Sequence, residues 1–423
     1  MQVPDAHCPN GNGIGVDTAE WTSPAAGNGD DIPGLAATME ANGDTLVIAS
    51  GDPTPTTAIA AEFRTACDLD PAFGDNGATQ LSAPGFPVNV SGVFPTADGG
   101  ALITGGTNVL DGHWFVGKLT ARGQLDQAFG DYGWAVLPWA GTATTIAVAP
   151  NGNIVVGGLG NDNGISSVGE ISAQGRPVTS FGTRGQTAMP PWHDGGVDGV
   201  WIEPDGNILA LVGGGNMGCW GVTAVTLTPS GRGVPGFTAA FDRALKSADP
   251  DRASGLPIFV GGLTVGSRGF HLVGTAQDDC VGNPPQQKPN PSQRVIDIAF
   301  GYDGNLDTAF GKDGVTSFSA PMASLGWVLP QSDASVLLVT SPYRGGPDQR
   351  RRDDVFVYRI SDTGRLETSY ADHGLAVVTL PYVLGSGVDY VAEPRPVSNG
   401  QRAAVVTLNA KGNAVVLIQV AVR

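Results

Sequence analysis

The sequence predicts an all-β fold, a seven-bladed β-propeller closed by the N-terminal strand pairing into the last blade. Three observations lead to this prediction. A short motif with an aromatic residue at its centre recurs along the chain, seven tight turns separate pairs of apolar segments, and the last repeat lacks a fourth strand. The 423 residues divide into seven repeats of about 60 residues each, and repeats of this size are typical of propellers and other arrays.

The recurring motif reads Leu-Asp-x-x-Phe-Gly-x-x-Gly in its clearest copies. Two weaker copies and one decayed copy keep the aromatic position, so that the six aromatic residues are Phe73, Phe129, Phe181, Phe237, Phe310 and Tyr370. An Asp at a turn bonds its own backbone, and glycines adopt the positive φ angles that tight turns need. We therefore predict a structural turn whose aromatic ring packs between blades. Calcium binding is the alternative, but a calcium loop needs a denser set of oxygen ligands.

A hairpin signal precedes each copy of the motif. Asn151-Gly152 between β-branched segments shows it best, because Asn-Gly between such segments is a strong hairpin signal. The counterparts turn at Asn42-Gly43, Asp98-Gly99, Asp205-Gly206, Arg268-Gly269, Asp333-Ala334 and Asn399-Gly400. A third strand, the motif and a fourth strand follow each hairpin, which gives four strands per blade. The predicted blades are residues 23–83, 84–137, 138–190, 191–250, 251–320, 321–380 and 381–423.

The two ends of the chain predict how the ring closes. The seventh repeat has apolar segments for three strands, near 388–393, 402–408 and 413–420, and then the sequence ends. Residues 12–20 resemble the glycine and strand that follow the motif elsewhere, so we expect them to supply the missing strand. A closed ring hides the strand edges that an open array would expose.

The motif and the hairpin spacing together resemble the bacterial delta-60 repeat proteins. The resemblance covers nearly the whole chain and implies a β-propeller, but it implies no particular activity. The sequence departs from the repeat in two places, the fourth repeat, where Val234-Pro235-Gly236-Phe237 replaces the motif, and an insertion between Gln277 and Arg294.

Composition excludes several classes of protein and partner. A hydrophobic share of 41% is enough for a core, and 63 glycines without a strict period exclude collagen. No apolar segment approaches the roughly 18 residues of a membrane-spanning helix, so we expect no membrane insertion. The net charge of −17 opposes binding to a phosphate backbone, so we expect no nucleic acid partner. We also expect no cofactor and a monomeric protein.

The four cysteines show no metal-binding spacing, so we expect no zinc site. Cys219 and Cys280 fall in corresponding loops of neighbouring blades, and Cys8 falls beside Cys67 where the ring closes. We predict the disulfides Cys8–Cys67 and Cys219–Cys280, with four buried free thiols as the alternative. Disulfides would imply a secreted or periplasmic protein, whose signal peptide would lie outside this sequence.

Aromatic residues gather on the rim that carries the connections between blades, and they are the main candidates for ligand binding. The predicted ligand-binding residues are Trp139, Trp192, His193, Trp220 and Tyr343. Flat rings on a rigid face suit a carbohydrate or protein ligand. The alternative is that these rings cap the blade cores.

Two functions follow from this rim. The first is an exported binding protein or scaffold that recognises a carbohydrate or a protein. The second is a carbohydrate-active hydrolase or lyase, in which rim carboxylates and a histidine transfer protons. The candidate catalytic residues are His113, His193, Asp194 and Glu203, with Asp198 as a further carboxylate. We expect His271 to be a packing residue.

Overall fold

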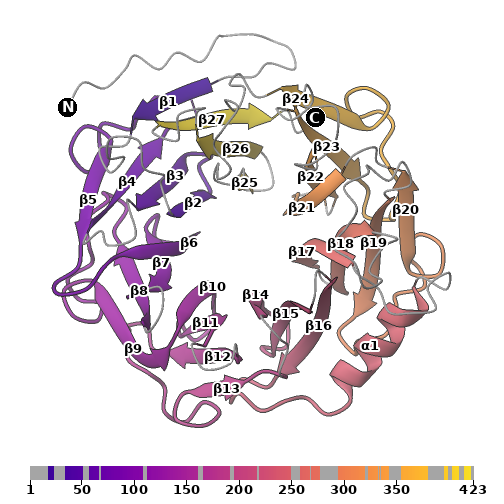
Figure 1. The fold of residues 1–423 in the computed structure, drawn as a ribbon, viewed down its shortest axis with the longest axis horizontal. Coiled ribbons are helices and arrows are strands. Elements are labelled where there is room, and N and C mark those ends of the chain that lie inside the picture. The colour runs from indigo at the N-terminus through magenta and orange to yellow at the C-terminus, as the bar shows by residue number, and fades with distance from the viewer. Residues whose placement is uncertain are drawn as a thin grey trace.

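In the computed structural model the strands form antiparallel sheets arranged in a ring (Figure 1). One strand of each sheet lies nearest the centre of the ring, and the later strands lie progressively further out. The structure describes residues 18–22, 34–50, 57–65, 68–107, 112–160, 165–190, 195–216, 219–248, 258–266, 268–276, 294–319, 323–331, 333, 335–342, 354–379, 395–398, 403–408 and 414–420. This arrangement confirms the all-β, propeller-like class that the repeats predict.

Among the described residues, six sheets have four strands. Five of them consist of consecutive strands: β2 (Gly34–Met39), β3 (Thr45–Ser50), β4 (Thr57–Phe63) and β5 (Ala78–Ser82); β6 (Asn89–Pro95), β7 (Ala101–Gly106), β8 (His113–Leu119) and β9 (Trp134–Ala140); β10 (Thr142–Val148), β11 (Ile154–Leu159), β12 (Ser166–Ile171) and β13 (Gln186–Ala188); β17 (Ile258–Val265), β18 (Gly269–Ala276), β19 (Arg294–Gly301) and β20 (Val315–Ser319); β21 (Ala323–Pro330), β22 (Val336–Pro342), β23 (Asp354–Ile360) and β24 (Leu375–Thr379). A seventh sheet contains only β14 (Gly196–Ile202), β15 (Ile208–Asn216) and β16 (Cys219–Leu227).

The sixth four-stranded sheet joins the two ends of the sequence. Its order is β1 (Thr18–Thr22), β27 (Ala414–Val420), β26 (Ala403–Leu408) and β25 (Arg395–Ser398). Thr18 pairs with Ile418 and Thr22 with Ala414, so β1 runs antiparallel to β27 along its whole length (Figure 1). The strand predicted at 12–20 is thus described at 18–22. The described innermost strand of this sheet, β25, lies at 395–398, and the segment predicted for it, 388–393, lies outside the described residues.

The fourth repeat differs from the prediction of four strands. In place of a fourth described strand it has the helix α1 (Phe237–Ser247), which lies on the outside of the ring (Figure 1). Phe237, Phe241 and Leu245 recur every four residues and are buried, which is the spacing of one helix face. Phe241 packs 4.7 Å from the ring of Phe300 in β19. Alanine-rich sequence with this spacing favours a helix over a strand.

The predicted hairpin turns of the first four sheets lie at one end of the sheets. In the first, the Gly43 amide donates to the Glu40 carbonyl and the Glu40 amide donates to the Asp44 carbonyl. Only Gly43 has a positive φ, of 94°, so this is a type I turn followed by a glycine bulge. The same pair of hydrogen bonds recurs at Thr96, Ala149 and Glu203. Short turns of this type leave little side-chain surface.

The motif with the aromatic residue forms a junction between neighbouring sheets, as predicted. The Gly130 amide donates to the Gln174 carbonyl of the next repeat at 2.9 Å. Phe129 is buried against Gly175, whose φ of 80° and close contact with the ring both require glycine. Asp126 accepts a hydrogen bond from the Ala128 amide at 3.0 Å, so its carboxylate stabilises the turn. Corresponding aromatic–glycine contacts are Phe73–Gly123, Phe181–Gly231 and Phe310–Gly364.

Candidate functional site

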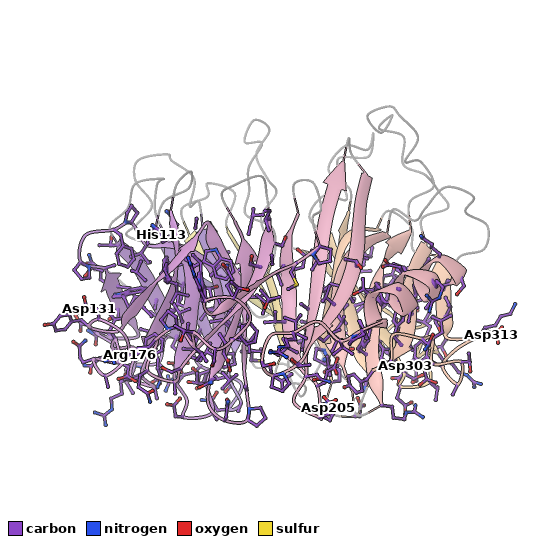
Figure 2. All side chains as sticks on the ribbon, turned by 90° about the horizontal axis from the view of Figure 1, so that it is seen from below. His113, Asp131, Arg176, Asp205, Asp303 and Asp313 are labelled. Carbon is purple, nitrogen blue, oxygen red and sulfur yellow. The ribbon has the colours of Figure 1, made fainter. Side chains whose placement is uncertain are left out.

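The ring has two faces, and the candidate residues are divided between them. We call the end of the sheets that carries the turns β2–β3, β6–β7, β10–β11 and β14–β15 the hairpin face. The opposite end, with the connections between sheets and between second and third strands, is the loop face. Figure 2 shows the two faces edge-on, with Asp205 and Asp303 on the hairpin face and His113 towards the loop face.

His113 is the described histidine of the loop face. It begins β8, its side chain is exposed, and its backbone amide donates to Thr107 Oγ1 at 2.8 Å. It pairs in register with Ala140 at the end of β9, beside the connection to the next sheet. This position agrees with the prediction that His113 lies on the rim of connections, although it does not test a role in proton transfer.

Trp139 has a different role from the predicted one. Its side chain is only 5% exposed and belongs to a core cluster that spans two sheets. The ring lies 5.4 Å from that of Trp114 in an edge-to-face arrangement and covers the backbone of Gly169 in β12. A ring buried in this way contributes to the packing between sheets and presents no face to a ligand.

Substituting Trp139→Ala is therefore expected to lower the free energy of unfolding by about 3–5 kcal/mol, the usual cost of removing a large buried aromatic side chain. Urea unfolding followed by circular dichroism measures this loss. Val136→Ala is the matched control, because Val136 lies on the same strand and is 47% exposed. Equal stabilities for the two variants would contradict the burial of Trp139.

Several predicted residues lie outside the described part of the chain. These are Trp192, His193, Asp194, Tyr343, Cys8, Cys67 and Cys280. Trp220 and Cys219 belong to β16, where their backbones pair with Gly215 and Asn216 at the end of the sheet. The two disulfides and the ligand-binding roles of Trp192, His193, Trp220 and Tyr343 stay predictions.

Glu203 lies on the hairpin face, and this corrects the prediction that it belongs to the rim of connections. It follows β14 at the turn into β15, is 3% exposed, and accepts a hydrogen bond from Thr226 Oγ1 at 3.1 Å. Burial raises the pKa of its carboxyl to about 7. A seven-residue strand spans about 20 Å, so Glu203 and His113 at opposite ends of the sheets do not act on one substrate bond.

Asp198 lies within β14, the innermost strand of its sheet, where the register with β15 shifts between Val197 and Gly199. Its carboxylate lies against the backbone of Gly213. Surrounding protein raises the pKa of Asp198 to about 6, although the side chain keeps contact with solvent. Such a group can exchange a proton near neutral pH, but the described residues place no second catalytic candidate beside it.

A group of four acidic side chains in the β2–β5 sheet was not predicted from the sequence. We call Glu40, Asp44, Glu62 and Asp70 the four-carboxylate cluster. Glu40 and Glu62 are 8% and 5% exposed. Burial, followed by repulsion from Asp44 and Asp70, raises the pKa of Glu40 to about 7. Burial, followed by repulsion from the other three carboxylates, raises the pKa of Glu62 to about 8.

The corresponding position in two other sheets carries a cation. Glu62, Lys118 and Arg359 each accept, through the backbone carbonyl, the amide of the motif's acidic residue at 2.8–2.9 Å. Lys118 Nζ lies 3.0 Å from Asp126 and 3.8 Å from Asp98. Arg359 Nε lies 2.8 Å from Glu367, and Arg359 also pairs with Asp333. The hydrogen bond from Lys118 lowers the pKa of Asp126, which is opposite to the shift at Glu62.

His271 is a packing residue, as predicted, but it has a polar partner. Its Nδ1 lies 3.2 Å from Oδ1 of Asp297, and its ring lies 4.6 Å from that of Phe310. Asp297 is 1% exposed, and burial raises its pKa. Neither group lies beside another candidate residue in the described part of the structure.

Comparison with known proteins gives likeness of shape alone. No protein-family model matches the sequence, and no curated protein matches it. The polysaccharide lyase Uly1 has a TM-score of 0.48 and 10% identity, over 100% of this chain and 94% of that one. Drosophila Semaphorin 1b, extracellular domains 1-2, has a TM-score of 0.45 and 10% identity, over 96% of this chain and 86% of that one. Saccharomyces cerevisiae Sqt1 has a TM-score of 0.43 and 11% identity, over 95% of this chain and 98% of that one.

Within the described residues no helix is long and apolar enough to cross a membrane.

Proposed function

We propose that this protein is a seven-bladed propeller closed by β1, and that it is a binding protein or scaffold with a carbohydrate or protein ligand on the loop face. Two features support the ring. Six four-stranded sheets and one three-stranded sheet account for the described strands, and β1 pairs with β27. A closed ring gives the rigid frame on which binding loops are usually carried.

The observation that carries the proposed binding face is that separations between consecutive strands vary on the loop face and repeat from sheet to sheet on the hairpin face. On the hairpin face β2 ends at Met39 and β3 begins at Thr45, and the longer separation from β4 (Phe63) to β5 (Ala78) recurs from β8 (Leu119) to β9 (Trp134). On the loop face β18 ends at Ala276 and β19 begins only at Arg294, and β22 and β23 are separated from Pro342 to Asp354. Sequence that a fold does not need for its strands is where recognition residues concentrate.

The separation of the described catalytic candidates favours binding over catalysis. His113 belongs to the loop face and Glu203 to the hairpin face, so these two candidates are divided. A hydrolase or lyase would have to combine His113, His193, Asp194 or Asp198, of which His193 and Asp194 lie outside the described residues. Export to the periplasm or beyond, with disulfides Cys8–Cys67 and Cys219–Cys280, belongs to the same proposal, because an extracellular ligand requires an exported binding protein.

A glycan array and a panel of purified extracellular proteins test the proposal, with binding quantified by calorimetry. For the ligand so found, Trp192→Ala and Trp220→Ala are each expected to weaken binding by more than about 1 kcal/mol, as is typical of aromatic anchors. Val148→Ala is the control, because Val148 is 50% exposed at the hairpin-face end of β10.

Binding that survives both tryptophan substitutions and fails in the Val148 variant would place the site on the hairpin face and refute the proposal. Release of new reducing ends or unsaturated products from a bound polysaccharide would favour the enzyme alternative instead. An absence of binding across both panels would count against a carbohydrate or protein ligand.

A further inference from the structure

We propose that the interface between the β17–β20 sheet and the β21–β24 sheet is held by one proton bound between His271 and Asp297, and that alkaline pH weakens this interface. The contacts involved lie between two sheets of the ring and do not depend on the ligand proposed for the loop face. At this interface a polar pair occupies positions that are apolar in other sheets.

The repeats show what the positions of His271 and Asp297 contain elsewhere. The backbone carbonyl that accepts a hydrogen bond from the motif aligns the third strands with one another, and it belongs to Ala299 in β19 and to Lys118 in β8. His271 pairs in register with Ala299, and Asp297 precedes Ala299 by two residues. In five other sheets the position of His271 is held by Leu46, Leu102, Val155, Leu209 and Leu337, and that of Asp297 by Ala60, Val116, Val168, Ala224 and Val357. Each of these apolar side chains is at most 1% exposed.

The pair faces the next sheet of the ring. Alternate residues of a strand share one face, so His271 lies on the face of Val273 and Asp297 on the face of Val295. Both valines belong to a core cluster with side chains of β22 and β23. The His271 ring also packs edge-to-face against that of Phe310, with 4.6 Å between the ring centroids. A change of charge in the pair therefore acts on the contact between the two sheets.

His271 is the group that compensates the charge of Asp297. Its Nδ1 lies 3.2 Å from Oδ1 of Asp297, whereas Oδ2 is buried and has no hydrogen-bond partner among the described residues. Thr264 in β17 pairs in register with His271, and Thr316 in β20 pairs with Asp297, and neither residue titrates. From the neighbouring sheet the core cluster contains Tyr358, and burial raises the pKa of this phenol to about 12, so it stays neutral below that pH.

One bound proton makes the pair neutral overall, either as imidazolium with carboxylate or as imidazole with carboxylic acid. Loss of this proton leaves a carboxylate that is 1% exposed beside a neutral ring, which is costly in a buried site. Burial raises the pKa of Asp297 above its ordinary 3.8, while His271 acts in the opposite direction. The folded state therefore holds the proton more tightly than the unfolded chain, and the stability it contributes is lost as the pH rises through the folded-state pKa.

Melting temperatures at pH 5.5 and pH 8.5 test the proposal, together with hydrogen exchange corrected for the intrinsic rate at each pH. The double variant His271→Leu with Asp297→Val restores the pair found at Leu102 and Val116. Its melting temperature is expected to fall by at least about 2 °C less than that of the wild type between the two pH values. Peptides of β18, β19, β22 and β23 are expected to lose protection at pH 8.5 in the wild type and to keep it in the double variant.

Two further variants complete the test. Asp297→Asn keeps the shape of the side chain but cannot ionise, so it is expected to reduce the pH dependence while His271 stays in place. The matched control is His373→Asn with Asp372→Asn, because these residues form a His–Asp pair at 3.7 Å whose side chains are 91% and 92% exposed. This control is expected to keep the pH dependence of the wild type, since exposed pairs contribute little to stability.

Equal losses of melting temperature in the wild type and the folded double variant would overturn the proposal. Loss of protection at pH 8.5 that spares β18, β19, β22 and β23 would also overturn it. If the double variant does not fold, Asp297→Asn decides the question, because a folded Asp297→Asn protein with the pH dependence of the wild type would show that the pair holds no such proton.

Discussion

Deleting residues 1–22 is expected to lower the melting temperature by more than about 10 °C and to cause aggregation. The deletion removes β1, whose five residues pair with β27 from Thr18↔Ile418 to Thr22↔Ala414. The edge of β27 would then be exposed, and a strand of sequence Ala-Val-Val-Leu-Ile-Gln-Val is apolar enough to pair with other chains. Differential scanning calorimetry and light scattering measure the two effects.

Two shorter deletions identify which part of the segment matters. Removal of residues 1–7 keeps both Cys8 and β1 and is expected to leave the melting temperature within about 2 °C. Removal of residues 1–17 keeps β1 but removes Cys8, so the difference between it and the 1–22 deletion isolates the strand. A 1–22 deletion that stays monomeric and as stable as the full chain would refute closure of the ring by β1.

The free energy of unfolding is expected to fall by a few kcal/mol as the pH rises from about 5 to 9. This is the order of magnitude that shifts of two to three pKa units imply. Glu40, Glu62 and Glu203 have folded-state pKa values of about 7, 8 and 7, above the 4.5 of the unfolded chain. The folded state therefore binds more protons in this interval. The stability that these groups contribute is fully present below pH 4.5 and is lost as the pH rises through 7 to 8.

Urea unfolding in EDTA at pH 5.5 and pH 8.5 measures this dependence, and two variants assign it. Glu62→Gln cannot ionise, so it is expected to match the wild type at pH 5.5 and to exceed its stability at pH 8.5 by about 1–3 kcal/mol. Asp126→Asn is expected to act in the opposite direction at pH 8.5, because the pKa of Asp126 is lowered by Lys118. A wild type that becomes more stable from pH 5.5 to 8.5 would contradict the raised pKa values.

The fold could be predicted because its determinants are local and repeated. Gly43 and Gly152 mark turns that only glycine can complete, and each motif aromatic residue such as Phe129 occupies the same junction. The helix α1 was not predicted, since Val234-Pro235-Gly236-Phe237 resembles a decayed motif and masks the four-residue spacing of Phe237, Phe241 and Leu245.

The site could be predicted only in part, because burial depends on contacts between sheets. The ring of Trp139 is buried because Gly169 in the next sheet makes room for it, and nothing near Trp139 in the sequence indicates this contact. Glu203 was assigned to the wrong face although the Asp205-Gly206 turn beside it marks the hairpin face. Glu62 was not predicted to be unusual, because the difference in its charge becomes visible only when it is aligned with Lys118 and Arg359, which hold the corresponding positions.

The aromatic–glycine junction also determines what a gene duplication of this protein must copy. Phe129 belongs to one repeat and its partner Gly175 to the next, so a copied segment that runs from one junction glycine to the following one contains one glycine and one aromatic residue. Each added segment therefore completes every junction of the enlarged ring, whatever the sequence of its sheet. Selection can therefore change individual sheets, such as the one that has α1 in place of a fourth described strand, while Gly304 still meets the backbone of Phe237 and Phe241.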